Sequence, residues 1–383
     1  MSSRDRAWAE VDLDAFRGNL RLARARAGIA QVWPVLKANA YGHGALRLAQ
    51  VCAQEGVDRI GVADGGEALL LRAAGLRVPL LVLGTVIDAE LRDLHAHRVE
   101  VGIHSEGRAR QLGEFATRTG QPLGVHLKVD VGMSRLGVRP EAVGRVANAI
   151  REFPALELRG IMTHFPAADG CRNPETAIQH ASFLDAARLV GAVFGRMPAA
   201  HCANSAALFT GLNPLGNAVR PGIALYGILP ASLPSAADLQ PVLSLRTQVV
   251  FLKDVPEGTP VGYDGRWIAH RSTRLAVLPI GYNDGVPWRL GSCGNGQVLV
   301  RGRRCPIVGA VSMDYSTVDV GHVPGVEVGD TVTLIGRDGL ESIGAADVAR
   351  CAGTIPYEIT CSIGARVRRV YKERSAAATA ALA

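Results

Sequence analysis

Short apolar segments alternate with longer amphipathic segments through about the first 230 residues of the chain. Segments with the length and composition of buried β-strands are residues 32–38, 59–63, 80–84, 100–104, 125–130, 158–165, 200–204 and 218–226. Segments with Ala, Leu, Arg and Glu at helical spacing are residues 46–55, 65–74, 140–152 and 174–193. This repetition predicts a (β/α)8 barrel of the TIM type. A doubly wound parallel sheet is the alternative.

The pattern changes after residue 240. Strand-like segments separated by Gly and Pro turns are residues 243–252, 274–280, 297–300, 312–320 and 326–334, followed by one helical segment at 343–351. We therefore predict an α/β protein with a barrel domain over residues 1–240 and a mainly β domain over residues 241–373. The first few residues are expected to pack with the second domain. The alanine-rich tail, residues 374–383, is expected to be disordered.

The composition is that of a globular protein. Of 383 residues, 48% are hydrophobic and 20% are charged, and a net charge of +7 is spread over scattered arginines. This charge favours an anionic small molecule over a nucleic-acid partner. Seven cysteines without a CxxC pair do not resemble a disulfide framework or a zinc site, so no metal is predicted. We expect a cytoplasmic protein with no membrane association, because the N-terminus lacks a signal-peptide core and no apolar run approaches roughly 20 residues.

One apolar segment ends at a lysine that could act as a nucleophile. In VLKANAYGHG, residues 35–44, Lys37 leaves a predicted strand and enters a loop of small residues. Partial burial would lower the pKa of this amine and free it to form a Schiff base with an aldehyde cofactor. A surface lysine at a strand end is the alternative. Lys37, His164, Asn204 and Arg220 all fall at or near the face where TIM-barrel active sites lie.

Nine motifs, in order along the chain, resemble those of the alanine racemases. They are VLKANAYGHG, LKVDVGMSRLGV, MTHF, HCANSAAL, VRPGIALYG, VGYDGRW, PIGYNDG, VSMD and IPYE. The resemblance covers residues 8–371 and implies a pyridoxal 5'-phosphate enzyme with a (β/α)8 barrel and a β domain. It further implies a homodimer with shared active sites that interconverts the small substrates L-alanine and D-alanine, which supplies D-alanine for peptidoglycan in bacteria.

The resemblance implies two catalytic bases on opposite faces of the cofactor. Lys37 matches the Schiff-base lysine, and Tyr263 in VGYDGRW matches the tyrosine of the opposite face. Because a phenol has an ordinary pKa near 10, Tyr263 needs help to act as a base at neutral pH. His164 matches the histidine that hydrogen-bonds this tyrosine. Taken alone, His164 fits a satisfied core histidine better than a functional one.

Other matched residues would hold the cofactor. Arg220 matches the arginine that faces the pyridine nitrogen. A guanidinium keeps its proton, so that nitrogen would stay unprotonated and the ring would be a restrained electron sink. The residues that match the phosphate contacts and the tyrosines closing the phosphate site are Ser205, Gly222, Ile223, Tyr41 and Tyr357. Taken alone, Arg220 could be an ordinary salt-bridge former and Ser205 an ordinary N-cap.

Further matches concern the substrate and the partner subunit. Arg135 matches the arginine that orients the substrate. Lys128 matches a lysine that is carbamylated in many members, and as a carbamate it could pair with Arg135. Met313 and Asp314 match residues of the β domain that are contributed across the dimer interface, where the Met313 backbone amide would meet the substrate carboxylate.

The access corridor is where the chain departs from the resemblance. Tyr282 and Asp169 match corridor positions, but Ala310 stands where many relatives have an arginine, and Asp264 follows the catalytic tyrosine where relatives often have a glycine. Losing a corridor charge could admit a larger substrate, so a broad-specificity, serine or lysine racemase is the alternative activity. A pyridoxal-phosphate-binding carrier would lack the β domain. A decarboxylase of the same superfamily would carry a catalytic cysteine, whereas this chain has Ser312 in VSMD.

Overall fold

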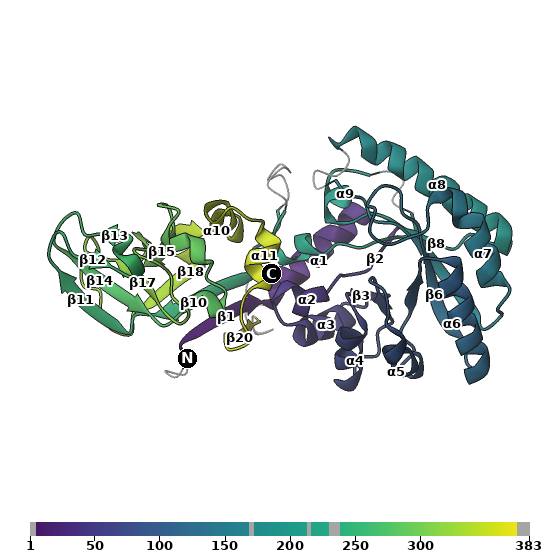
Figure 1. Ribbon diagram of the computed structural model, residues 1–383, viewed down its shortest axis with the longest axis horizontal. Coiled ribbons are helices and arrows are strands. Elements are labelled where there is room, and N and C mark those ends of the chain that lie inside the picture. The colour runs from purple at the N-terminus through teal and green to yellow at the C-terminus, as the bar shows by residue number, and fades with distance from the viewer. Residues whose placement is uncertain (1–4, 168–171, 213–215, 230–237, 374–383) are drawn as a thin grey trace, which may run out of the picture.

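The computed structural model describes residues 5–167, 172–212, 216–229 and 238–373. Two lobes lie next to each other along the long axis of the molecule (Figure 1). Strand β1 (Ala7–Asp12) begins in one lobe and leads directly into helix α1 (Leu13–Ala27) of the other. Asp12 accepts a hydrogen bond from the backbone N–H of Ala15 and thereby caps the start of α1. None of the helices in these ranges has the length and apolar character that crossing a membrane requires.

Within the described ranges, eight parallel strands close into a barrel in the α/β lobe. They are β2 (Gln31–Val32), β3 (Ile60–Val62), β4 (Leu80–Val82), β5 (Val101–Ile103), β6 (Leu123–Lys128), β7 (Leu156–Met162), β8 (Ala199–His201) and β9 (Ala218–Val219). Hydrogen-bonded ladders join β5 through β9 to β2, and β3 to β4. The bridges Val35–Gly61 and Leu81–Glu100 complete the ring. The predicted (β/α)8 barrel is therefore confirmed.

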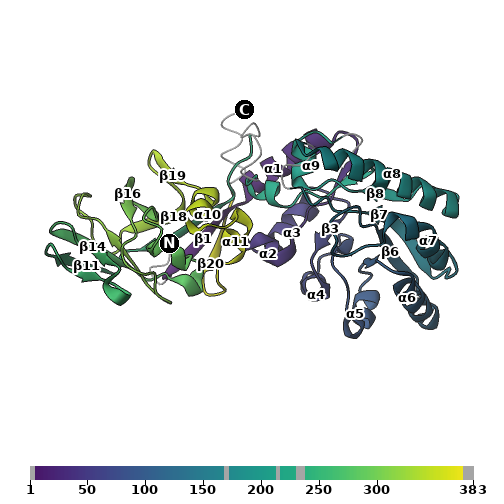
Figure 2. The same ribbon diagram turned by 45° about the horizontal axis from the view of Figure 1, so that its top comes forward.

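Helices surround this barrel (Figure 2). They are α3 (Ala45–Gln54), α4 (Gly65–Ala73), α5 (Leu91–Ala96), α6 (Glu106–Thr119), α7 (Val143–Arg151), α8 (Pro174–Phe194) and α9 (Ser205–Phe209). The side chains of Asp64, Ser105 and Asn173 cap the starts of α4, α6 and α8. Helices α6 and α8 end at the left-handed glycines Gly120 and Gly195. The four predicted helices agree with the structure to within three residues at each end.

The other lobe is mainly β, as predicted. Its strands are β10 (Leu243–Gln248), β11 (Phe251–Val255), β12 (Pro260–Val261), β13 (Trp267–Ile268), β14 (Thr273–Leu278), β15 (Gln297–Val300), β16 (Arg303–Pro306), β17 (Ser316–Asp319), β18 (Thr331–Asp338), β19 (Glu341–Ile343) and β20 (Arg368–Lys372). The largest sheet has the order β16-β15-β18-β10-β1-β20, with β19 paired to β18. Helices α10 (Ala345–Ala352) and α11 (Pro356–Cys361) lie between β19 and β20 in the sequence. Helix α11 packs against the barrel turn α2 (Lys37–Tyr41).

Strand β1 joins the two ends of the chain in one sheet. It pairs antiparallel with β10 and parallel with β20. Arg369, a residue of β20, donates a hydrogen bond from Nε to the carbonyl oxygen of Gly42 at 3.0 Å. This contact links the sheet to the barrel beside α2. The β lobe is thus fastened to the barrel next to the segment that carries Lys37.

Several predicted strands are longer than the observed ones. The predicted strand 218–226 ends at Val219, because the chain turns through Pro221 and Gly222 into the 3-10 helix η4 (Ile223–Tyr226). The predicted strand 312–320 begins only at Ser316, after a tight turn. In both cases the apolar composition continues beyond the point where backbone pairing stops.

One pair of cysteines is joined. Cys293 and Cys351, 58 positions apart, form a disulfide, although the cysteine spacing predicts no disulfide framework. Among the described residues, Cys52, Cys305 and Cys361 are free cysteines.

Candidate functional site

A cavity of about 490 Å³ opens at the carboxyl ends of the barrel strands. Its lining includes four basic side chains, Lys37, Lys128, Arg135 and Arg220, and no Asp or Glu among the described residues. Placing several cations together without a counter-charge is unfavourable in a partly buried site. The cavity is therefore suited to an anionic ligand.

Lys37 begins a turn of left-handed helix. Ala38, Asn39, Ala40 and Tyr41 have φ angles between +52° and +55°, a conformation that costs roughly 1–2 kcal/mol per non-glycine residue. The predicted strand 32–38 is therefore wrong from residue 37, where the turn begins, although β2 itself ends at Val32 and the Val35–Gly61 bridge continues its pairing. Strain of this kind persists where surrounding contacts enforce it, and it is concentrated at functional sites.

His43 supplies one of those contacts. Its Nδ1 lies 2.8 Å from the carbonyl oxygen of Tyr41 and 3.1 Å from that of Ala40. Burial lowers the pKa of His43 to about 4, so the ring is neutral and donates from Nδ1. This fully buried imidazole holds the carbonyl groups at the end of the turn. His43 belongs to the motif VLKANAYGHG, but the sequence alone gives it no role.

The amine of Lys37 is poised to lose its proton. Burial lowers its pKa, and the nearby positive charges of Arg135 and Arg220 lower it further. The ammonium also lies 5.9 Å from the centre of the Tyr41 ring. A neutral amine is the nucleophilic form of lysine.

Lys128 is another perturbed amine in the cavity. Burial, followed by the charges of Arg220, Arg135 and Lys37, lowers its pKa to about 8. Its Nζ donates a hydrogen bond to the carbonyl oxygen of Leu83 at 2.8 Å. Close to neutral pH, part of the population therefore carries an uncharged amine beside three cations.

Arg220 is held firmly at the end of β9. Its Nη2 donates to the carbonyl oxygen of Thr163 at 2.5 Å, and its Nη1 lies 2.8 Å from Nδ1 of His201. Burial lowers the pKa of Arg220 to about 10, so the guanidinium stays protonated at neutral pH. It therefore donates hydrogen bonds and does not transfer a proton.

His164 lines the same cavity as a neutral ring. Burial, together with the charges of Arg220, Lys37, Arg135 and Lys128, lowers its pKa to about 3. An imidazole in this state can donate and accept a hydrogen bond without adding charge to the cavity.

One end of the cavity has little steric bulk and several polar groups. The hydroxyl of Ser205 accepts hydrogen bonds from the backbone N–H groups of Gly222 at 2.9 Å and Ala224 at 3.3 Å. Asn204 caps α9 by accepting from the N–H of Ala207, so the alternative of Ser205 as an N-cap is wrong. A β-carbon on Gly222 would lie 2.3 Å from the hydroxyl oxygen of Tyr41. Only glycine fits this position without displacing Tyr41.

Two tyrosines complete the wall of the cavity. The rings of Tyr41 and Tyr357 lie 6.1 Å apart, and burial raises the pKa of both phenols. They are therefore protonated and act as hydrogen-bond donors. Ile223, the first residue of η4, also lines the cavity.

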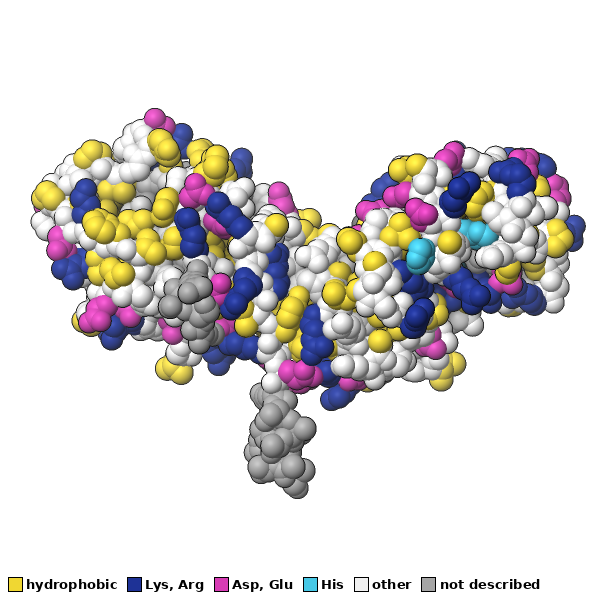
Figure 3. All heavy atoms as spheres, turned by 90° about the horizontal axis from the view of Figure 1, so that it is seen from below, with side chains coloured by type: hydrophobic (Ala, Val, Ile, Leu, Met, Phe, Trp, Pro, Cys, Tyr) yellow, Lys and Arg dark blue, Asp and Glu magenta, His cyan; other side chains and the backbone are white. Residues whose placement is uncertain are grey.

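The structure does not bring every predicted site residue to this cavity. The residues that line it are Lys37, Tyr41, Lys128, Arg135, His164, Ser205, Arg220, Gly222, Ile223 and Tyr357. Those of the β lobe that do not line it are Tyr263, Tyr282, Met313 and Asp314. Asp169 lies outside the described residues. Tyr263 and Met313 are 71% and 54% exposed, and Figure 3 shows apolar side chains gathered on a face of the β lobe.

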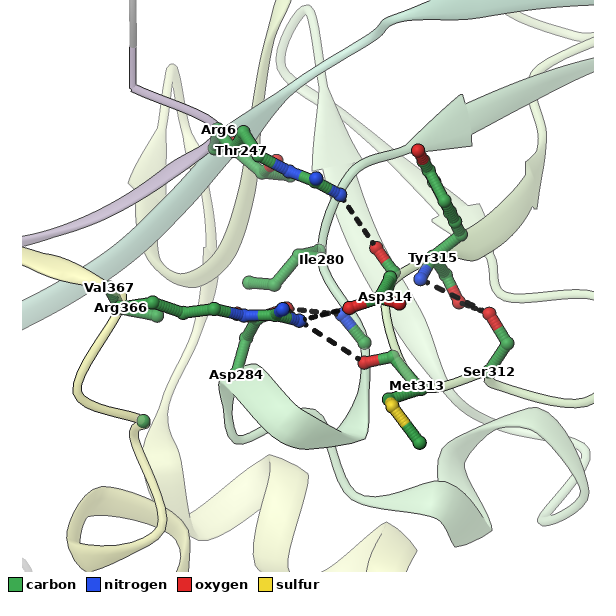
Figure 4. A network of polar contacts seen from close by, with 12 residues as sticks. Arg6, Thr247, Ile280, Asp284, Ser312, Met313, Asp314, Tyr315, Arg366 and Val367 are labelled. Atoms are coloured by element: carbon green, nitrogen blue, oxygen red, sulfur yellow. Dashed lines mark hydrogen bonds and ion pairs between the residues drawn. The ribbon is translucent and has the colours of Figure 1, made fainter.

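Met313 and Asp314 lie in a turn that an ion-pair network fixes (Figure 4). Arg366 contacts Asp314 from Nη2 and Asp284 from Nε, each at 2.5 Å. Asp284 is buried and accepts a hydrogen bond from the N–H of Gly281 at 2.9 Å. The Met313 side chain is thus presented to the outside on a rigid support.

Known proteins resemble the chain over nearly its whole length. The family described as "Alanine racemase, N-terminal domain" matches residues 11–230, and "Alanine racemase, C-terminal domain" matches residues 242–371. The alanine racemase of Methanococcus maripaludis is 39% identical over 368 residues, which cover 95% of this chain and 98% of that protein.

Two solved structures have the same fold. The alanine racemase of D-cycloserine-producing Streptomyces lavendulae superposes with a TM-score of 0.90 at 33% identity, covering 97% of this chain and 98% of that one. The alanine racemase of Bartonella henselae, solved with covalently bound pyridoxal phosphate, has a TM-score of 0.84 at 29% identity, covering 96% and 99%. The chain belongs to the alanine racemase family.

Proposed function

We propose that the protein is a pyridoxal-phosphate-dependent alanine racemase that interconverts L-alanine and D-alanine. The observation that carries this proposal is the cavity at the barrel mouth, where Lys37 lies with Lys128, Arg135 and Arg220 and where no described lining residue is Asp or Glu. Family membership supports the same activity. In a bacterial cell the product would supply D-alanine for peptidoglycan.

The residues present fit pyridoxal phosphate. When bound, this cofactor supplies an aldehyde that condenses with amines and a ring that withdraws electrons from the substrate. The phosphate would be held near Ser205, Gly222 and Ile223, where a glycine leaves space and the phenol of Tyr41 can donate a hydrogen bond. Arg220 would face the ring nitrogen as a donor, and Lys37 would supply the amine for the aldehyde.

Lys37 is the base that one chain supplies. Its lowered pKa favours the neutral amine, which is the form that can accept a proton. Arg135, in the same lining, is a permanent cation that would bind the substrate carboxylate and orient the α-carbon.

Racemisation requires a second base on the opposite side of the substrate. Tyr41 and Tyr357 have raised pKa values and His164 has a very low one, so none of these described residues is a good proton acceptor. From the resemblance to the alanine racemases, we infer that Tyr263 of a second copy of the chain is this base and enters the cavity, with Met313 and Asp314 beside it. The exposure of Tyr263 and Met313 in a single chain supports this shared-site homodimer.

Lys128 is proposed to be carbamylated. A carbamate would replace one cation of the cavity with an anion and give Arg135 a partner. A cytoplasmic location is also proposed.

The direct test is enantiomer analysis after incubation with single amino acids. The purified protein, supplied with pyridoxal phosphate, is incubated with L-alanine, L-serine or L-lysine, and the D-enantiomer is measured by chiral chromatography. We expect D-alanine to form fastest and Lys37→Ala to form none. Faster turnover of serine or lysine would contradict alanine specificity and favour the alternative racemase. Absence of D-enantiomer from every substrate would contradict the proposed function.

A further inference from the structure

A chain of buried hydrogen bonds runs from Arg220 into the barrel. Nη1 of Arg220 lies 2.8 Å from Nδ1 of His201, and Nε2 of His201 lies 2.8 Å from Nδ1 of His126. Nε2 of His126 lies 2.8 Å from Oε2 of Glu100, and Nε of Arg59 lies 2.7 Å from the same oxygen. Neither imidazole is exposed to solvent.

These residues cross the barrel from one end to the other. Arg220 follows β9 at the carboxyl ends of the strands, where the cavity opens, and His126 lies within β6. Glu100 and Arg59 directly precede β5 and β3, at the amino ends of the strands. Gly160 makes room for the link, because a β-carbon there would lie 2.6 Å from Nδ1 of His126.

The two ends of this hydrogen-bond chain fix its direction. A guanidinium only donates and a carboxylate only accepts. His201 must therefore accept at Nδ1 and donate from Nε2, and His126 must do the same. Each ring is then the Nε2–H tautomer, and the reverse arrangement would set a donor against the guanidinium of Arg220.

The charges agree with this arrangement. Burial lowers the pKa of His201 and of His126, so both rings are neutral. Burial acts to raise the pKa of Glu100, but the hydrogen bond from His126 and the charge of Arg59 act against burial, and the net pKa is lowered. The Trp33 ring packs against this chain of hydrogen bonds. Its centre lies 4.6 Å from the centre of the His201 ring and 4.2 Å from the guanidinium carbon of Arg59.

We propose that Glu100 and His126, acting through His201, are positioning residues that fix the orientation of the Arg220 guanidinium at the cavity. The proposal rests on the proposed function in one respect, namely that Arg220 faces the cofactor ring. Together with the carbonyl oxygens of Thr163 and His201, which also accept hydrogen bonds from this guanidinium, a carboxylate at the far end of the barrel then helps to set which atoms of Arg220 remain free to contact that ring.

The first test reads the tautomers in the wild-type protein. The cofactor-loaded protein is labelled with ¹⁵N at histidine, and solid-state ¹⁵N spectra are recorded between pH 6 and pH 9. The His126 and His201 signals are identified by their loss in His126→Phe and His201→Phe. We expect both rings as neutral Nε2–H tautomers throughout. A protonated Nδ1 in either ring would overturn the proposal, and this readout does not depend on racemase activity.

The second test separates positioning from stability. His126→Phe removes the link below His201, whereas His95→Phe removes another buried histidine, on α5, whose Nε2 contacts the carbonyl oxygen of Gln121 at 3.1 Å. Both variants should melt at lower temperature than the wild type. We expect His126→Phe to lower kcat roughly ten-fold with KM within about two-fold, and His95→Phe to leave both within about two-fold. Equal effects in the two variants, or an unchanged kcat in His126→Phe, would overturn the proposal.

Because the wild type serves as the reference, the two hypotheses fail in different ways. A wild-type protein that binds pyridoxal phosphate with the expected tautomers but does not racemise alanine would contradict only the proposed function. An active wild type whose kcat is insensitive to His126→Phe would contradict only the positioning role.

Discussion

Gly222 and Tyr41 approach so closely that a β-carbon on Gly222 would lie 2.3 Å from the Tyr41 hydroxyl oxygen and 2.9 Å from the ring carbon that bears it. The glycine comes from the segment after β9 and the tyrosine from the left-handed turn after Lys37. The two segments that would hold the cofactor phosphate are therefore fitted to each other.

Gly222→Ala should weaken cofactor binding. Overpacking of this kind typically costs about 1–3 kcal/mol, so the Kd for pyridoxal phosphate should rise roughly 5- to 150-fold, measured by absorbance titration of the cofactor-free protein. Gly18→Ala is the matched control, because a β-carbon there meets nothing within 4 Å and the residue lies inside α1. The control should keep wild-type affinity and gain up to about 1 kcal/mol in stability. Equal affinities in the two variants would refute a phosphate site beside Gly222.

Asp314→Asn should loosen the turn that carries Met313. The substitution removes the charge-assisted contact with Arg366 at 2.5 Å. Because Arg366 and Asp314 are both partly exposed, we expect the fold to persist and KM for alanine to rise about two- to five-fold. The control is Asp254→Asn, which breaks an exposed ion pair with Arg274 on β11 and β14. If KM rises equally in both variants, the turn has no special role.

Lys128 should react with carbon dioxide in a pH-dependent way. Because its pKa is about 8, the amine is mostly protonated below pH 8 and mostly neutral above it, and only the neutral form is nucleophilic. Carbamate formation, followed by ¹³C NMR with the concentration of dissolved labelled carbon dioxide held constant at each pH, should therefore become faster as the pH rises from 7 to 9. Lys128→Arg should show no such signal. A carbamate signal that persists in that variant would place the modification elsewhere.

The sequence pattern was sufficient for the architecture but not for the local backbone. Apolar segments located the barrel strands because strands buried on both faces need apolar residues throughout. The same composition extended the first strand to residue 38, although strand pairing ends with the Val35–Gly61 bridge and the chain then forms a left-handed turn from Lys37. Alanine disfavours that turn, so nothing local predicts it. Contacts such as those of His43 with Tyr41 and Ala40 enforce it.

The sequence motifs predicted most of the residues that line the cavity, but they did not predict the buried residues that hold Arg220 in place. The matched residues of the barrel meet in one cavity because they follow strands that end at the same face. His126 and Glu100 are far apart from Arg220 in sequence and become its supports only through the barrel's closure. The Cys293–Cys351 pair likewise depends on tertiary packing. Tyr263 and Met313 are exposed in the single chain that the structure describes, so their predicted place in the site of a second copy stays a prediction.

A mixture of two inactive variants tests whether the site is shared. Lys37→Ala and Tyr263→Phe are each expected to be inactive as homodimers. A mixed dimer would contain one site with both wild-type residues, so a randomised equal mixture should recover about one quarter of wild-type activity. Subunit exchange is verified with two differently tagged chains. If mixed dimers form without activity, Lys37 and Tyr263 do not act together across an interface.

The most direct test of the account is the exchange of the α-proton of each alanine enantiomer in D2O. Lys37 and Tyr263 are proposed to act from opposite sides, with Lys37 serving D-alanine and Tyr263 serving L-alanine. Tyr263→Phe removes the phenol and keeps the ring, so the account predicts exchange from D-alanine far faster than from L-alanine, followed by ¹H NMR. Equal loss of exchange from both enantiomers would contradict the two-base assignment.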